Sequence, residues 1–198
     1  MPPIPQVTKI LMIACTAIFL LREVNLLPLD MWFALWPLGS GMFGPWQVVT
    51  YAFLHGDTFH LFFNMLGLWM FGSELERLWG ERRYMQFIAA GVLAAAVAQL
   101  LVSAVLGSRG PTVGISGALF ALLLAFGMLF PNRIIMPLFP PIPMKARNFV
   151  LLFGGLELLF GLIGRSGVAH FAHLGGMVGG FLMIRYWRRQ PPFGSRRR

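Results

Sequence analysis

Residues 172–180 read AHLGGMVGG and combine one histidine with four glycines in an apolar run. His173, Gly176 and Gly180 follow one another at spacings of three and four residues, so a helix presents them on one face. A face of small residues lets two membrane helices pack closely. The segment therefore predicts that His173 lies against a neighbouring helix, and the helix that contains Gly117 is the candidate. Simple close packing, with a histidine hydrogen-bonded across helices, would explain this segment equally well.

The chain around this segment is too apolar for a soluble protein. It has 198 residues, of which 57% are apolar or aromatic and only 12% are charged, and its mean hydropathy is +0.71. Soluble domains carry roughly 45–50% apolar and about 25% charged residues. The composition therefore predicts an integral membrane protein in the lipid bilayer, of a length that suits one domain.

Six apolar ranges have the length of a membrane span, which takes about 20 residues for a hydrocarbon layer of roughly 30 Å. The ranges are 7–26, 58–74, 84–106, 116–131, 148–164 and 169–187. The sequence thus predicts an all-α membrane protein, a single six-helix domain over residues 1–198 whose last part, 188–198, is a basic tail.

The basic residues indicate how these spans are oriented. With six crossings, 13 of the 16 lysines and arginines fall on the side of the two termini, and only Arg22, Arg109 and Arg165 fall on the other. The positive-inside rule then predicts that both termini are cytoplasmic. The net charge of +9 does not indicate a nucleic acid partner, because the basic residues cluster between apolar runs and at the tail and form no interleaved basic–aromatic surface.

Ser116 begins the fourth span within the segment Gly114-Ile115-Ser116-Gly117. A serine at a helix N-terminus lies beside unpaired N–H groups that can stabilise an oxyanion, although an ordinary capping serine would occupy the same position. Counted along each helix from a charged residue at its cytoplasmic end, Ser116 lies at about 25 Å, His173 at about 22 Å and His60 at about 21 Å. All three therefore lie at a similar depth below the outer surface of the membrane. This shared depth predicts a water-filled cavity that opens to the outer side.

Residues 60–64 read HLFFN and place His60 and Asn64 on one helix face. Two neutral donors there suit a developing negative charge. A metal site made of His55, His60, His170 and His173 is disfavoured, because no His-x-x-x-His pair and no acidic residue supports it. We therefore expect no metal and no cofactor.

The acidic residues offer no obvious partner for His173. Asp30 and Asp57 fall in or near the outer loop, and Glu157 falls in the middle of the fifth span. The sequence predicts a serine–histidine pair without a carboxylate, and Glu157 is expected to be a protonated or hydrogen-bonded packing residue.

Taken together, these segments resemble the rhomboid family of intramembrane serine proteases. The resemblance covers about residues 44–188 and rests on HLFFN at 60–64, GISG at 114–117 and AHLGGMVGG at 172–180. ERLWG at 76–80 is similar to a further family motif. One departure is Gln47, which follows Trp46 where many relatives have arginine, so the anchoring of this loop is left open.

The resemblance implies a function and a site. Ser116 would be the nucleophile and His173 the general base, and His60, Asn64, Gly114 and the Ser116 backbone N–H would form the oxyanion site. The substrates would be transmembrane proteins, entering through a gate between spans two and five that Phe63 faces. His55 and His170 would be structural.

The resemblance is to the minimal six-helix bacterial-type form. It implies a multi-pass protein of the bacterial plasma membrane whose site opens to the outer side. A catalytically inactive relative that binds membrane clients is the alternative. Such relatives typically lose the serine or the histidine, or carry proline beside the serine, whereas residue 115 here is isoleucine. A small transporter would predict internal symmetry, which the sequence lacks.

Overall fold

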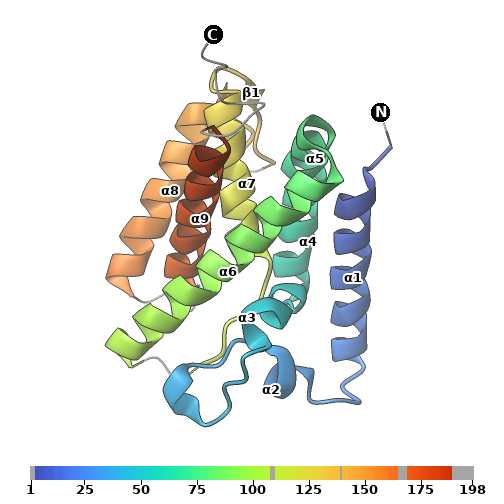
Figure 1. Ribbon diagram of the computed structural model, residues 1–198, viewed down its shortest axis with the longest axis vertical. Coiled ribbons are helices and arrows are strands. Elements are labelled where there is room, and N and C mark those ends of the chain that lie inside the picture. Colours follow the sequence, from blue (N-terminus) through green and yellow to red (C-terminus); the bar gives the residue numbers. More distant parts are fainter. Residues whose placement is uncertain (1–2, 108–109, 139, 165–168, 189–198) are drawn as a thin grey trace.

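The computed structural model describes residues 3–107, 110–138, 140–164 and 169–188, and it is mostly helical (Figure 1). The long helical segments are α1 (Gln6–Glu23), α4 (Thr58–Gly67) with its continuations η3 (Leu68–Gly72) and α5 (Ser73–Trp79), α6 (Glu81–Leu106), α7 (Ser116–Leu129), α8 (Ala146–Ile163) and α9 (His170–Arg188). The short elements are α2 (Leu29–Phe33), η1 (Leu38–Ser40), α3 (Gln47–Thr50), η2 (Tyr51–Phe53) and the strands β1 (Ile134–Ile135) and β2 (Met144–Lys145), which pair antiparallel.

Helices account for nearly all of each apolar range that the sequence marked as a span. Among the described residues, α6 and α8 are long and apolar enough to cross a membrane, and α7 is a shorter apolar helix. The first turn of α1 and the last turn of α9 lie at the same end of the bundle, with α2 and α3 at the opposite end (Figure 1). α1 and α8 lie at opposite edges.

Helices α6, α7 and α9 pack closely because small residues line their contacts. A Cβ on Gly176 of α9 would overlap the carbonyl group of Gly117 in α7, and a Cβ on Gly180 would lie 2.9 Å from the Cβ of Ala121. Gly91 of α6 faces Ala118 in the same way. The prediction that the His173 face packs against the helix containing Gly117 is therefore confirmed.

Glu76, from the segment ERLWG, holds the start of α1. Its buried carboxylate accepts hydrogen bonds from the backbone N–H groups of Val7 and Thr8, at 2.8 and 2.7 Å, and from the Thr8 hydroxyl at 2.7 Å. A carboxylate at a helix N-terminus satisfies N–H groups that have no partner within the helix. The motif thus ties α5 to the first turn of α1.

Gln47 anchors the loop in which the sequence departs from many relatives. Its side chain is buried and accepts a hydrogen bond from the backbone N–H of Trp36 at 3.1 Å. Its amide donates to the carbonyl oxygens of Trp32 and Met42, at 3.2 and 3.0 Å. A neutral side chain with both donors and an acceptor therefore holds this loop together.

Candidate functional site

Ser116 is the first residue of α7 and is held by the loop that precedes it. Thr112 and Leu35 exchange two backbone hydrogen bonds of 2.9 Å. The N–H of Gly114 donates to the carbonyl oxygen of Tyr51 at 2.9 Å. Gly114 has a φ of +114°, which a residue with a side chain rarely adopts. The loop is thus fixed to neighbouring segments immediately before Ser116.

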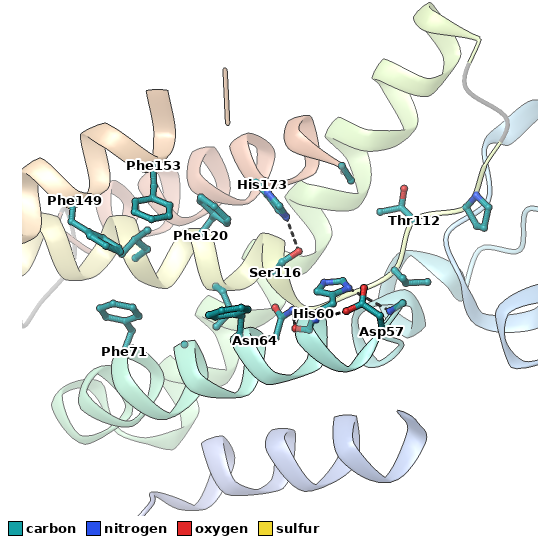
Figure 2. A pocket seen from close by; sticks show the side chains of 18 residues that line it. Asp57, His60, Asn64, Phe71, Thr112, Ser116, Phe120, Phe149, Phe153 and His173 are labelled. Carbon is teal, nitrogen blue, oxygen red and sulfur yellow. Dashed lines mark hydrogen bonds between the residues drawn. The ribbon is translucent and has the colours of Figure 1, made fainter. Parts of the chain in front are cut away.

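His173 of α9 meets Ser116 directly. Its Nε2 lies 2.8 Å from Ser116 Oγ (Figure 2). The imidazole stacks on the ring of Phe120, one turn further along α7, with 4.4 Å between ring centroids and 12° between ring planes. In the neutral tautomer with hydrogen on Nδ1, Nε2 accepts a hydrogen bond from the Ser116 hydroxyl. This is the geometry of a nucleophile beside its base.

His60 of α4 lies on the other side of Ser116 from His173 (Figure 2). Its ring is also close to Gly114. A Cβ on Gly114 would lie only 2.7 Å from His60 Nε2, so glycine is what lets the ring approach the loop. The N–H of Gly56 donates to His60 Nδ1 at 3.4 Å. In the neutral ring Nε2 then carries the hydrogen, and it is a donor beside the serine. Asp57 caps α4 by accepting from the His60 N–H at 2.8 Å.

Asn64 follows His60 by one helical turn and is buried. Its Nδ2 donates to the His60 carbonyl oxygen at 2.7 Å, which leaves one amide hydrogen for another partner. Its Oδ1 is buried and has no hydrogen-bond partner in the described part of the chain. The amide is therefore only partly used by the fold.

One cavity of about 650 Å³ joins these side chains. Its polar end carries Ser116, His173, His60 and Asn64 (Figure 2). Gly114 lies in the loop beside these side chains. Its other walls carry five phenylalanines from α4, η3, α7 and α8, namely Phe63, Phe71, Phe120, Phe149 and Phe153. The cavity combines a small polar constellation with an apolar surround, as ligand sites commonly do.

Glu157 corrects the expectation that no carboxylate faces His173. Its Oε2 lies 2.8 Å from His173 Nδ1 and 2.6 Å from His170 Nδ1. The contact arises where α8 packs on α9, with Gly154 beside Met177 and Gly161 beside Phe171. The sequence did contain a signal, because a carboxylate in the middle of an apolar helix needs a partner, and two histidines three residues apart share one face.

The four histidines form two pairs instead of one cluster. The rings of His55 and His60 are 5.1 Å apart, and those of His170 and His173 are 6.4 Å apart. Glu157, His170 and His173 do bring three ligand atoms within 4.8 Å of one another. Their contacts of 2.6 and 2.8 Å are hydrogen-bond distances, however, and ligand atoms around a tetrahedral zinc ion are about 3.3 Å apart. These distances suit N–H···O hydrogen bonds from the two histidines to the carboxylate better than a metal ion.

Comparisons with known proteins identify relatives of the chain. Residues 43–190 match the model of the rhomboid domain. Presenilin-associated rhomboid-like protein A, mitochondrial, of Danio rerio is 29% identical over 152 residues, which cover 73% of this chain and 39% of that protein. Rhomboid protein 1, mitochondrial, of Saccharomyces cerevisiae is 31% identical over 138 residues, 69% of this chain and 40% of that protein.

RHOMBOID-like protein 12, mitochondrial, of Arabidopsis thaliana is 31% identical over 144 residues, which cover 65% of this chain and 42% of that protein. The chain thus spans about two fifths of the length of the curated relatives it matches. These relatives are named as mitochondrial proteins, so the prediction of a bacterial plasma membrane is wrong. The match over residues 43–190 covers well over half of the chain, which therefore belongs to the rhomboid family.

Proposed function

We propose that the chain is an intramembrane serine endopeptidase that hydrolyses peptide bonds in or near transmembrane segments of other membrane proteins. The observation that carries this proposal is the 2.8 Å contact between Ser116 Oγ and His173 Nε2 at the polar end of the cavity. His173 takes the hydroxyl proton as Oγ bonds to the substrate carbonyl carbon. The protonated ring then gives this proton to the leaving amine, and water hydrolyses the acyl-enzyme with the same base.

The negative charge that develops on the substrate oxygen needs donors close to Ser116. His60 Nε2–H and the free amide hydrogen of Asn64 line the cavity, and the backbone N–H of Ser116 is at the N-terminus of a 14-residue helix. The first N–H groups of a helix have no partner within it. We assign these three groups to the oxyanion site, with Gly114 making room for the His60 ring.

The membrane arrangement belongs to this proposal. All six helical segments, α1, α4 to α5, α6, α7, α8 and α9, would cross the bilayer as one domain over residues 1–198. The start of α1 and the end of α9 at one end of the bundle support termini on one side of the membrane (Figure 1). Ser116 would then lie below the opposite surface. The basic tail lies outside the described residues from 189 onward.

A transmembrane substrate would reach Ser116 laterally, between α4 and α8. Phenylalanines from both sides line the cavity there, with Phe63 on α4 and Phe149 and Phe153 on α8. Phe63 is 53% exposed although it also lines the cavity, as a side chain at an entrance would be. Because a helix hides its carbonyl groups in hydrogen bonds, substrates with helix-weakening residues near the cleaved bond should be favoured.

A fluorophosphonate probe, which reacts with activated serines, tests the proposal on the full chain in detergent micelles. The wild type should be labelled and should cleave a model transmembrane substrate, and Ser116→Ala should do neither. An unlabelled wild type that still binds membrane proteins would identify the chain as an inactive, client-binding relative. Undiminished cleavage by Ser116→Ala would contradict the assignment of the nucleophile.

A further inference from the structure

Glu157 is a carboxylate in the middle of an apolar helix, and the proposed serine–histidine chemistry does not yet use it. It lies within α8, an 18-residue segment with the length and composition of a membrane span, and its side chain is only 13% exposed. An ionisable group in such a place is costly, and its partners usually have a function. The partners of Glu157 are the Nδ1 atoms of His170 and His173.

His173 has two ring nitrogens, and each faces an oxygen atom of a neighbouring side chain. Nε2 faces Ser116 Oγ at 2.8 Å, and Nδ1 faces Glu157 Oε2 at 2.8 Å. Nδ1 is buried and has no hydrogen bond of regular geometry to any described residue. The terminal torsion of a glutamate is soft, so a rotation of this carboxylate can align Oε2 with the Nδ1–H bond.

A base for Ser116 needs its hydrogen on Nδ1, so that Nε2 is free to accept a proton. The stacked Phe120 ring restrains the plane of the imidazole but does not choose between its two tautomers. A carboxylate beside Nδ1 favours one tautomer, because an ionised carboxylate can only accept a hydrogen bond and Nδ1 must then carry the hydrogen. It also stabilises the imidazolium that forms when His173 takes the serine proton.

We propose that Glu157 is a positioning residue for His173, so that the site operates as a Ser116–His173–Glu157 triad instead of a pair. This inference rests on the proposed function. The proton moves from Ser116 Oγ to His173 Nε2 and then to the leaving amine, while the hydrogen on Nδ1 stays on the ring. Glu157 remains ionised throughout.

His170 holds the carboxylate in place. Its Nδ1 lies 2.6 Å from the same oxygen, Glu157 Oε2, that faces His173. Two neutral rings that each carry hydrogen on Nδ1 can both donate to one carboxylate oxygen. The histidine three residues before His173 thus fixes the position of Glu157 on α8.

The experiment compares Glu157→Gln with the wild type in micelles, using the fluorophosphonate and a model transmembrane substrate. Because glutamine keeps the shape and removes the charge, kcat and the maximal labelling rate should fall on the order of 10²- to 10⁴-fold. KM and the probe's binding constant should change little, and the unfolding temperature should stay close to that of the wild type. Glu157→Asp, which keeps the charge, should recover part of the loss.

Two further variants separate positioning from packing. Glu74→Gln removes a carboxylate that is paired with Arg133 and lies outside the cavity lining, so it should leave kcat unchanged. His170→Gln should reduce kcat less than Glu157→Gln, since Glu157 keeps its contact with His173.

Wild-type rates in Glu157→Gln would overturn the inference, and so would a loss confined to KM or shared equally by Glu157→Asp. These results would leave the serine protease proposal intact, provided that labelling of the wild type still depends on Ser116. A wild type without Ser116-dependent labelling would instead remove the proposed function itself.

Discussion

Gly176 of α9 faces the backbone of Gly117 in α7 so closely that no Cβ can be placed between them. Ser116 directly precedes Gly117, and His173 lies one turn before Gly176. The 2.8 Å contact between Ser116 and His173 therefore depends on the close approach of these two helices.

Gly176→Ala should push α9 away from α7 and separate the serine from the histidine. Overpacking of this kind lowers the free energy of unfolding by about 1–3 kcal/mol. The rate of substrate cleavage should fall as well. Thermal unfolding and the labelling rate measure the two effects. Gly155→Ala is the matched control, because no atom of the described residues lies within 4 Å of a Cβ at this exposed position of α8. It should retain activity and raise stability by about 0.5–1 kcal/mol. Equal behaviour of the two variants would contradict the role of the contact.

Ser116→Ala and His173→Ala should each abolish cleavage while the protein stays folded. Because the two residues would act as a unit, the double variant should lose little beyond either single variant. Turnover of a model transmembrane substrate by purified protein measures all three. Multiplicative losses would show that the residues act independently.

Asn64→Ala should slow turnover with a smaller effect on substrate binding. Loss of one oxyanion donor typically lowers kcat about 10²- to 10³-fold, which is roughly 3–4 kcal/mol. Steady-state kinetics separates kcat from KM. Gln99→Ala removes an amide from α6, away from this cavity, and should leave kcat unchanged. An increase in KM alone would assign Asn64 to substrate docking.

Phe63→Ala should speed cleavage of a transmembrane substrate and barely change fluorophosphonate labelling, because it widens only the lateral route. Phe59→Ala is the control: Phe59 lies on the same helix, is 77% exposed and does not line the cavity. Parallel measurements of cleavage and labelling decide the question. Equal acceleration of both reactions by Phe63→Ala would indicate a general loosening of the fold.

Local sequence patterns determined much of the secondary structure of this protein and indicated its family. Apolar runs predicted the helices, because the period and length of such runs depend only on neighbouring residues. The spacing of His173, Gly176 and Gly180 predicted a tightly packed face for the same reason, and α9 does pack on α7 through it. The motifs around His60, Ser116 and His173 also pointed to the family that the rhomboid domain match establishes.

The sequence patterns did not determine the membrane in which the protein resides. Basic residues report the orientation of the spans relative to a membrane, since they respond to the side on which charge is retained. They do not distinguish one membrane from another. The mitochondrial names of the relatives, and not any pattern in the residues, corrected the predicted location.

Only the tertiary structure decided which helices meet, and so which polar side chains become partners. Glu157 faces His173 because α8 packs on α9, and Glu76 caps α1 across 68 positions of sequence. Gln47 likewise satisfies three backbone groups of its loop. The physical reason is that helix periodicity specifies the face on which a residue lies, whereas its neighbour across that face depends on the packing of the whole bundle.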